Sequence, residues 1–344
     1  MYRITLTPAG DLTTLGHRWQ ALEQDADPGF FRCWTFLGCK AESRFSGARL
    51  LSVTQDGADV ALALLARRRW RSWLNQTGDP AQDAPFIEHN GLLLRRGHEH
   101  TIAPALASAL RRAGPLVLSG IGHLTCEAAR EAGWLNLAQS RFAPCVALDT
   151  LERPYIDTLS ANARAQIKRS QRLYGPDLRL RRAESLDQAQ SFFTELVEHH
   201  QAAWQARGKT GAFAQTVMQA FHRALIARAW PIGEADLLRI SVGDAPIGLL
   251  YNLIHRGRVY SYQSGFAYSA DSRIKPGLVS HALAIQHYAS LGFQAYDLLA
   301  GADRYKLTLA SGGEMLHWGT LYGRFSATGL LARARHGFKT NGLS

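Results

Sequence analysis

Cysteine is scarce in this sequence. Four cysteines occur among 344 residues, and no two of them have the CxxC spacing of a zinc site or a redox pair. This scarcity argues against a secreted fold held by disulfides, and we expect reduced thiols in a cytoplasmic protein. No cluster of His, Cys and Asp has metal-ligand spacing, so we expect no metal site.

Long apolar segments are also missing. The longest uncharged run, Gly277 to Tyr296, is interrupted by Gly292 and contains histidine, serine and glutamine. A membrane span needs about 20 predominantly apolar residues, so a buried helix followed by a strand fits this run better. Met1 to Gly10 lacks the apolar stretch of a secretory leader. We therefore expect a soluble protein without a membrane span.

Acidic residues are outnumbered, and the imbalance is uneven. Residues 1–150 contain 16 Lys/Arg and 14 Asp/Glu, whereas residues 151–344 contain 23 and 14. An excess of positive charge in the second half suits an anionic partner. A phosphorylated cofactor, an acyl carrier protein and tRNA satisfy it equally. The length and the 46% hydrophobic content predict two domains, each with its own core.

The first half has the pattern of an α+β domain. An edge strand at Arg3–Leu6 and helices over Leu12–Gln24 and about Phe30–Leu37 precede a hairpin. The hairpin joins Leu50–Thr54 to Val60–Leu65 through an Asp-Gly turn, which is a strong hairpin signal. The remaining elements alternate, and we expect them in this order: strands Trp73–Gln76 and Phe86–Leu94, helix Ile102–Arg112, strand Pro115–Ser119 and helix Thr125–Gly133.

The second half repeats this plan. A basic helix at Ser160–Tyr174 stacks four cations on one face and ends at Gly175-Pro176. A capping box at Ser185 then opens a long helix. The rest follows the order of the first half: a helix over Ala214–Trp230, strands Leu237–Val242, Pro246–Ile254 and Arg258–Ser264, a helix from Leu278, and strands Phe293–Leu299 and Met315–Tyr322.

The turn before the Leu278 helix is a candidate anion site. It reads Ser-Arg-Ile-Lys-Pro-Gly, from Ser272 to Gly277. Free amides at a helix start attract anions, and the cations Arg273 and Lys275 add to that field. Pro276 suits the first helical turn, and Gly277 lets a diphosphate approach the backbone. An ordinary helix start with solvated charges is the simpler alternative.

The strands that flank this helix supply further candidates. Tyr260, Tyr262 and Ser264 alternate on one face of a strand, where tyrosines are commonly core residues. Asp297 ends the following strand in an apolar context and could be a general base or a structural ion-pair partner. A Gly-Ala-Asp-Arg-Tyr-Lys elbow at 301–306 then offers one phenol and two cations.

The first half has its own titratable cluster. Asp83, Glu88 and His89 lie in or after a polar loop, with Glu88 on a predicted strand. A carboxylate there could bind or deprotonate an amine acceptor. A polar loop with a surface strand is the competing interpretation.

Five motifs follow one another in an order that resembles the Fem-like (FemAB/CelD-like) double-domain branch of the GNAT acyltransferase superfamily. They are Trp204-x-x-Arg207-Gly208, Tyr262-Gln263-Ser264-Gly265-Phe266, Pro276-Gly277-Leu278, Asp297, and the Gly301 to Lys306 elbow. The likeness covers roughly residues 155–325 and is weaker over 1–150. The usual GNAT pyrophosphate loop, Gln/Arg-x-x-Gly-x-Gly/Ala, is absent, and the Pro-Gly turn stands in its place.

The resemblance implies an α/β (α+β) fold of tandem GNAT-like domains, each a mixed, mainly antiparallel sheet flanked by helices. The expected boundaries are 1–150 for an acceptor-side domain, 151–183 for a basic helical junction, 184–325 for the acyl-donor domain and 326–344 for a tail. Acyl transfer from a thioester donor to an amine, without a metal, is the implied activity. We expect the acceptor to enter an interdomain cleft.

The implied residue roles fall into three groups. Catalytic candidates are Asp297, Glu88 and Tyr262. Candidates for binding the donor, acyl-CoA or acyl carrier protein, are Gln263, Ser264, Gly265, Arg273, Lys275, Pro276, Gly277, Leu278, Tyr305 and Lys306. Candidates for binding the amine acceptor, a small molecule or a peptide, are Asp83, His89, Trp204 and Tyr260.

Two other functions remain open. A Fem-like aminoacyl-tRNA-dependent transferase would use the basic face of Ser160–Tyr174, with Arg179, Arg181 and Arg182, to bind tRNA phosphates. A non-catalytic GNAT-like module would bind a carrier protein or a peptide instead, and it would tolerate neutral residues at Asp297, Glu88 and Lys306.

Overall fold

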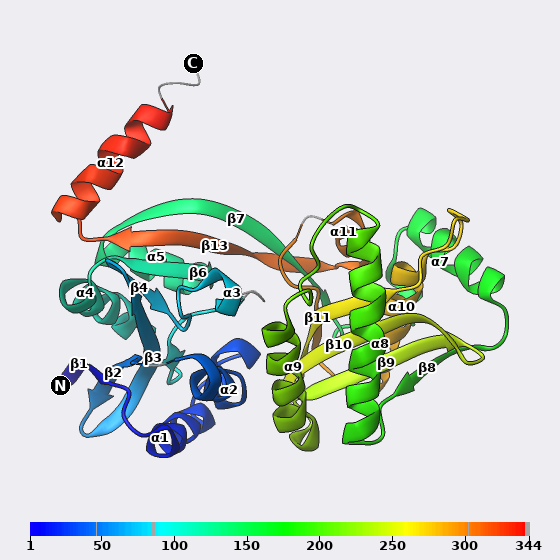
Figure 1. Cartoon of the computed structure of the whole chain (residues 1–344), viewed down its shortest axis with the longest axis horizontal. Coiled ribbons are helices and arrows are strands. Elements are labelled where there is room, and N and C mark those ends of the chain that lie inside the picture. Colours follow the sequence, from blue (N-terminus) through cyan, green and yellow to red (C-terminus); the bar gives the residue numbers. More distant parts are fainter. Residues whose placement is uncertain (46, 84–86, 302, 341–344) are drawn as a thin grey trace. The chain divides into compact units, whose positions relative to one another are not determined.

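The computed structural model describes residues 1–45, 47–83, 87–301 and 303–340, with side chains up to residue 334. The chain divides into two compact units (Figure 1). Unit 1 consists of residues 1–141 and 315–344, and unit 2 consists of residues 142–314. The expected boundary at residue 150 thus differs from the observed one, and the last 30 residues return to unit 1.

Unit 1 contains the following elements along the chain: β1 (Tyr2–Pro8), α1 (Leu12–Gln24), η1 (Phe30–Arg32), α2 (Trp34–Arg44), β2 (Arg49–Gln55), β3 (Ala58–Arg68), β4 (Arg71–Leu74), α3 (Pro80–Asp83), β5 (Leu93–Leu94), η2 (Glu99–Thr101), α4 (Ile102–Ala113), β6 (Leu116–Ile121), α5 (His123–Ala132), the first part of β7 (Trp134–Ala147), most of β13 (Gly312–Tyr322) and α12 (Ala327–Thr340).

The sheet of unit 1 has the strand order β1-β2-β3-β4-β6-β13. All of its neighbours are antiparallel except β4 and β6. The predicted hairpin between β2 and β3 is confirmed, because Asp56 and Gly57 both have positive φ (51° and 87°), as a tight two-residue turn requires. Leucine, valine and alanine of β2, β3, β6 and α4 form its core.

Unit 2 contains the following elements: the last part of β7, α6 (Tyr155–Thr158), α7 (Ala161–Tyr174), β8 (Leu178–Arg182), α8 (Leu186–Gln205), α9 (Thr216–Ala229), η3 (Trp230–Ile232), β9 (Ala235–Val242), β10 (Ala245–His255), β11 (Arg258–Phe266), α10 (Pro276–Ser290), β12 (Ala295–Asp297), α11 (Arg304–Leu309) and the start of β13.

The sheet of unit 2 has the strand order β7-β12-β11-β10-β9-β8, and only its β11–β12 pair is parallel within the described residues. Helix α8 packs on one face, where Phe193 meets Tyr251 of β10. Helix α10 packs on the other face, where Tyr288 meets Asn252, the next residue of β10. Figure 1 shows α8 and α10 beside these strands. Because successive side chains of β10 point to opposite faces, the strand contributes to a buried layer under each helix.

The two halves of the chain share one order of elements, namely strand, two helices, three-stranded meander, helix, strand, helix and strand. Their last strands are exchanged. Strand β7, from the first half, pairs with β12 in unit 2, and β13, from the second half, pairs with β6 in unit 1. The predicted fold class, α/β with mixed, mainly antiparallel strands flanked by helices in tandem units, is confirmed, although the strand orders of the two units are parts of one mixed sheet rather than two separate sheets. The exchange explains why residues 315–322 belong to unit 1.

The predicted strand over Phe86–Leu94 is wrong. Phe86 itself lies outside the described residues, and only Leu93 and Leu94 form a strand. Glu88 therefore lies in irregular backbone. The reason is a close approach of this segment to β6: a side chain at Gly120 would come within 2.5 Å of the Ile87 carbonyl. His89 also has a positive φ of 48°, which breaks an extended run.

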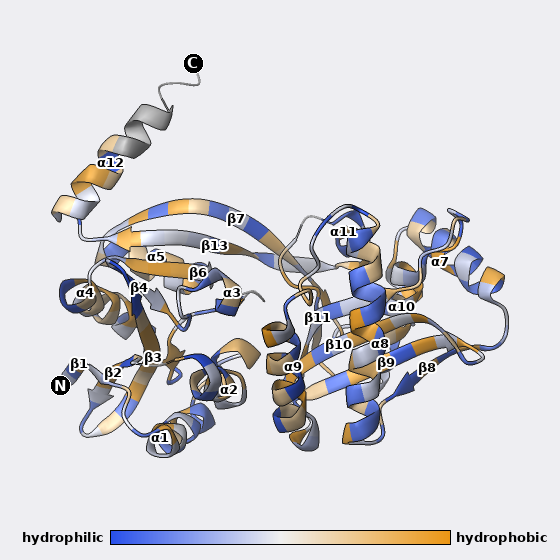
Figure 2. Ribbon diagram, viewed as in Figure 1, coloured by the Kyte–Doolittle hydropathy of each residue, from blue (hydrophilic) through white to orange (hydrophobic). Residues whose placement is uncertain are grey.

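Hydropathy along the described helices agrees with the sequence: none combines the length and the apolar content that crossing a bilayer demands (Figure 2).

Candidate active site

Helix α10 begins with an uncapped first turn. Pro276 occupies its first position, no side chain caps it, and the backbone N–H of Lys275 donates to Ser170 Oγ at 2.9 Å. The amides of Gly277 and Leu278 lie in the first turn, where no helical carbonyl precedes them. They are the groups that an anion would contact.

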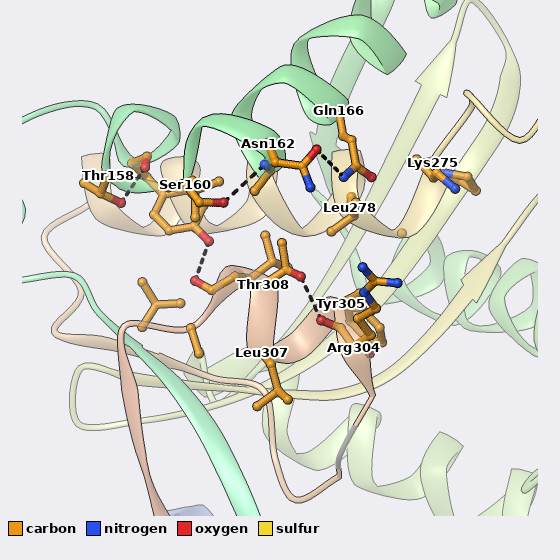
Figure 3. A pocket seen from close by; sticks show the side chains of 18 of the residues that line it. Thr158, Ser160, Asn162, Gln166, Lys275, Leu278, Arg304, Tyr305, Leu307 and Thr308 are labelled. Carbon is orange, nitrogen blue, oxygen red and sulfur yellow. Dashed lines mark hydrogen bonds between the residues drawn. The ribbon is translucent and has the colours of Figure 1, made fainter.

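A cavity of about 1000 Å³ opens beside this turn. Lys275, Pro276, Gly277 and Leu278 all line it, and so does Tyr305 of α11. Five of the ten predicted donor-binding residues thus share one cavity in unit 2. Figure 3 shows Lys275 and Leu278 on one wall and Arg304 and Tyr305 opposite.

The start of a second helix also reaches this cavity. Ser160, the N-cap of α7, accepts a hydrogen bond from the Ala163 amide at 3.3 Å, and Asn162 and Gln166 complete this part of the lining (Figure 3). The sequence predicts the helix but not that its first turn meets α10. No signal in the spacing indicates this meeting, because about 110 residues separate the two helix starts.

The cavity is electropositive. Lys275 and Arg304 are its only charged lining residues, and no carboxylate is found among the described residues that line it. Two helix N-termini add partial positive charge. Leucines, Phe266 and Ile274 form the apolar part of the wall. This combination suits a ligand with an anionic head and an apolar chain.

Strand β11 leaves its parallel neighbour early. Its pairs with β12 run only from Arg258 to Tyr260, because β12 ends at Asp297. On its other edge the pairing with β10 slips at Tyr262, as in a β-bulge, and then continues to Phe266. Beyond Tyr260, β11 is therefore paired with β10 but no longer with β12.

The candidate site residues of β11, Tyr260 and Tyr262 to Gly265, do not line the cavity. Tyr262 is buried in an aromatic cluster, with its ring 5.3 Å from His222 and 5.7 Å from Tyr251. The Ser264 carbonyl contacts His200 Nδ1 at 3.1 Å. Gln263 is half-buried, and Gly265 lies under α8. Tyr260 is buried as well, so these positions are parts of the sheet and its packing.

A buried histidine lies behind Tyr305. The His281 ring stacks on Tyr305 at 5.4 Å with an interplanar angle of 17°, and His281 Nδ1 lies 3.1 Å from Tyr296 Oη. Burial and, to a smaller extent, the Lys306 ammonium together lower the pKa of His281 to about 3. The imidazole is therefore neutral at ordinary pH. Burial also raises the pKa of Tyr305, which keeps this phenol protonated.

A chain of buried hydrogen bonds extends from this histidine. Tyr296 Oη donates to Asn252 Oδ1 at 3.5 Å, and Asn252 Nδ2 donates to Tyr288 Oη at 3.0 Å. Tyr288 donates to Asp236 at 2.9 Å, and Asp236 is paired with Arg182 at 2.8 Å. Apart from Arg182, which the sequence suggested for tRNA phosphates, these residues were not predicted to have a role. Polar residues spaced along otherwise apolar strands and helices were the available signal.

Asp297 lies in a second cavity, of about 480 Å³. It is 1% exposed, accepts from Arg258 at 2.9 Å and accepts the Leu299 amide at 2.8 Å. Ala147 and Ser311 line both cavities, so the two are neighbours. The sequence left a structural ion pair open for Asp297, and the structure shows such a pair with Arg258.

Arg273 and Lys306 do not line the larger cavity. Arg273 pairs with Asp271 at 2.8 Å, and this guanidinium lowers the pKa of Asp271 to about 2. Lys306 Nζ donates to the carbonyls of Leu299 and Ala300, both at 3.3 Å. It thereby fastens the elbow, in which Ala302 lies outside the described residues.

The Trp-x-x-Arg-Gly motif reaches the cavity wall through its arginine. The Arg207 guanidinium lies 5.6 Å from the ring of Tyr268, which lines the cavity. Trp204 itself packs against His200, 5.8 Å away, and does not line the cavity.

The candidates of the first half belong to unit 1. Asp83 accepts the amides of Thr77 and Gly78 and pairs with the buried Lys40 at 3.3 Å. Burial lowers the pKa of Lys40 to about 8 in spite of this partner. His89 stacks on Phe31 at 6.5 Å, and Glu88 is buried. The observed contacts of Asp83 and His89 organise the loop and the core of unit 1.

Comparison with known proteins gives the family of unit 2. Residues 160–307 match the model described as an acetyltransferase (GNAT) domain. This range contains α7, the cavity-lining start of α10 and most of α11. No curated protein matches the sequence.

Solved structures share the fold of the whole chain at low sequence identity. FemX has a TM-score of 0.62 at 9% identity and covers 89% of this chain and 96% of its own. L-PGS from Bacillus licheniformis has 0.55 at 13% identity, with coverages of 92% and 94%. A tandem GNAT protein from the clavulanic acid biosynthesis pathway has 0.51 at 12% identity, with coverages of 94% and 100%. The predicted Fem-like, double-GNAT architecture is confirmed.

Proposed function

We propose that this chain, in which residues 160–307 match a GNAT acetyltransferase domain and whose fold is similar to that of FemX, is a GNAT-type acyltransferase. Its donor would be a thioester, acyl-CoA or acyl carrier protein, and its acceptor an amine. The observation that carries the proposal is the electropositive cavity of about 1000 Å³ between the starts of α7 and α10. It combines free helix-start amides, two cations and an apolar wall in the matched domain.

The donor's phosphates would lie at the Gly277 and Leu278 amides, with Lys275 and Arg304 as counter-charges. Its thioester carbonyl would accept a hydrogen bond from the backbone of β11 at Phe266, which lines the cavity and lies beyond the end of the β12 pairing. Such a donor stabilises the oxyanion that forms during attack.

The reaction we propose is direct. The amine nitrogen attacks the thioester carbon, a C–N bond forms, and the C–S bond breaks when the tetrahedral intermediate collapses. The nitrogen loses one proton, and the departing thiolate gains one. The Tyr305 phenol, which lines the cavity and stays protonated, would donate a hydrogen bond to the departing sulfur, and water would supply the thiolate's proton.

Asp297 is our proposed acceptor for the amine's proton, from the neighbouring cavity. Its ion pair with Arg258 favours the ionised carboxylate, which is the form that accepts a proton. The other predicted roles, of Glu88 and Tyr262 in catalysis and of Asp83, His89, Trp204 and Tyr260 in acceptor binding, stay predictions.

Gly277→Asp tests the donor site. A carboxylate there repels the phosphate and competes with it for the helix-start amides. We expect donor affinity to fall by about tenfold, since an anion at a helix start is stabilised by up to ~2 kcal/mol. Gly277→Ala is the matched control, because a Cβ there meets nothing closer than 3.4 Å. The measurement is calorimetric titration with acyl-CoA and with loaded carrier protein.

Two results would contradict the site. The aspartate variant could bind the donor as tightly as the alanine variant does, or both could lose binding equally. Donor binding with no transfer to any amine in a mass-spectrometric screen would instead support a non-catalytic binding module.

Aminoacyl-tRNA is the second candidate donor. The observation in its favour is the exposed basic surface of α7, where Lys168 and Arg172 line a shallow pocket with Gly175-Pro176. Binding through phosphates should fall steeply as salt rises, because released counterions drive it. Lys168→Glu/Arg172→Glu should abolish tRNA binding and leave acyl-CoA binding intact. Stabilisation of the protein by charged tRNA alone would reverse our ranking of donors.

A further inference from the structure

Helix α12 (Ala327–Thr340) has an apolar stripe whose leucines are exposed to solvent. Ala327, Leu330, Leu331 and Ala334 follow the i, i+3, i+4, i+7 spacing of one helical face. Leu330 and Leu331 are 54% and 62% exposed, and Phe325, just before the helix, is 89% exposed. Figure 2 shows the first turns of α12 as an apolar band at the end of the chain.

The other side of α12 attaches it to unit 1. Gly329 is buried, and a Cβ on it would lie 2.4 Å from the Gly323 carbonyl. Arg333 lies over the ring of Trp134 at 5.1 Å. Arg324 donates to the carbonyls of Arg130 and Glu131 at 3.0 and 3.1 Å. At 100° per residue, Leu331 lies on the side of the helix opposite Gly329 and Arg333, and Leu330 lies on its flank, which is why both leucines stay exposed.

The charge of this segment is of one sign. Residues 315–344 contain four Lys/Arg and no Asp or Glu. Two copies of such a segment repel each other, whereas a surface of anionic lipid attracts it. A helix with one apolar stripe and basic flanks, too short to cross a bilayer, lies in the plane of a membrane surface.

We propose that α12 docks this protein on an anionic lipid surface, with Phe325, Leu330 and Leu331 entering the headgroup region. This inference is independent of the donor cavity, because α12 belongs to unit 1 and the cavity lies in unit 2. It concerns the surface to which the protein binds and not the substrate that it uses.

Vesicle sedimentation of the full chain tests the inference. Wild-type protein should bind vesicles that contain phosphatidylglycerol, bind phosphatidylcholine vesicles weakly, and be released by salt. Leu330→Glu/Leu331→Glu should weaken binding by about tenfold or more, because each substitution removes apolar contact and adds a repelled charge. Ile232→Glu/Leu291→Glu is the matched control, since these residues are 63% and 56% exposed in unit 2.

Three results overturn the inference. The wild type could fail to bind the anionic vesicles, the control could lose binding as much as the α12 variant does, or the α12 variant could bind fully. If ultracentrifugation shows a wild-type dimer that the α12 variant cannot form, and vesicles bind neither protein, a second copy covers the stripe.

Discussion

The buried side chain of His281 supports Tyr305, a residue of the cavity wall. Its ring supports Tyr305 from behind, and its Nδ1 meets the Tyr296 hydroxyl at the end of a hydrogen-bond chain that begins at Arg182. A charged imidazole would repel Lys306 and would be costly to bury. The neutral ring is therefore a condition for the observed arrangement.

A pH dependence of stability follows from this histidine. Its folded-state pKa of about 3 lies below its ordinary value of 6.5, so the unfolded chain binds the extra proton between these values. Stability is thus lost as the pH falls below 6.5. Near pH 5 the loss is about 2 kcal/mol, since one proton is worth ~1.4 kcal/mol per pH unit.

Urea unfolding at neutral and acidic pH measures this loss. His281→Gln should be less stable at neutral pH but should show a shallower decline on acidification. A variant whose decline parallels that of the wild type would assign the effect to other groups, of which the buried His200 is one.

Asp83 and Lys40 form a buried pair whose members depend on each other. Asp83→Asn leaves the lysine without a charge partner, and we expect unfolding free energy to drop by about 3 kcal/mol. Lys40→Met in the same chain removes the stranded charge and should restore part of it. If the double variant is no more stable than Asp83→Asn alone, the pair is not coupled as the 3.3 Å distance implies.

At the scale of elements, helix α8 approaches β11 closely because Gly265 has no side chain. A Cβ there would lie 2.6 Å from the Leu196 carbonyl and 3.0 Å from His199 Cβ. Gly265→Ala should therefore cost about 1–3 kcal/mol through displacement of α8. Gly277→Ala, where a Cβ would make only an ordinary van der Waals contact with the Phe266 ring at 3.4 Å, should change stability by less than ~1 kcal/mol. Equal thermal unfolding of the two variants would show that α8 adjusts freely.

Most elements could be predicted from local patterns. Helix α8 begins at Ser185 as its capping box indicates, although Gln188 reaches back to the Glu184 amide, one residue earlier than expected. Turn residues located both meanders. Strand β7 was not predicted. Residues 138–141 in its middle are exposed, apolar and polar residues alternate only weakly along it, and Pro144 argues against a strand.

The candidate site also contains features that local sequence predicts and features that it does not predict. The Pro276-Gly277 start of α10 is a local feature, and it lines the large cavity as an anion site should. Asp297 was singled out from its own strand, but Arg258, its partner, lies on a parallel neighbour 39 residues away in sequence. Contacts of this kind depend on strand pairing, which local spacing does not specify.

At the scale of the whole molecule, two copies of one plan have exchanged their last strands. Each unit therefore contains a strand from the other half of the sequence. Neither half of the sequence, taken as residues 1–150 or 151–344, holds all the strands of its sheet. Because β13 comes from the second half of the sequence, unit 1 lacks this strand until the second half has been synthesised.

A crystal structure with a non-transferable thioether analogue of acyl-CoA tests the central claim most directly. We predict its phosphates at the Gly277 and Leu278 amides, Lys275 and Arg304 beside them, and its acyl chain next to Phe266 in the apolar wall of the cavity. An analogue bound anywhere outside this cavity, with the starts of α7 and α10 untouched, would contradict the account.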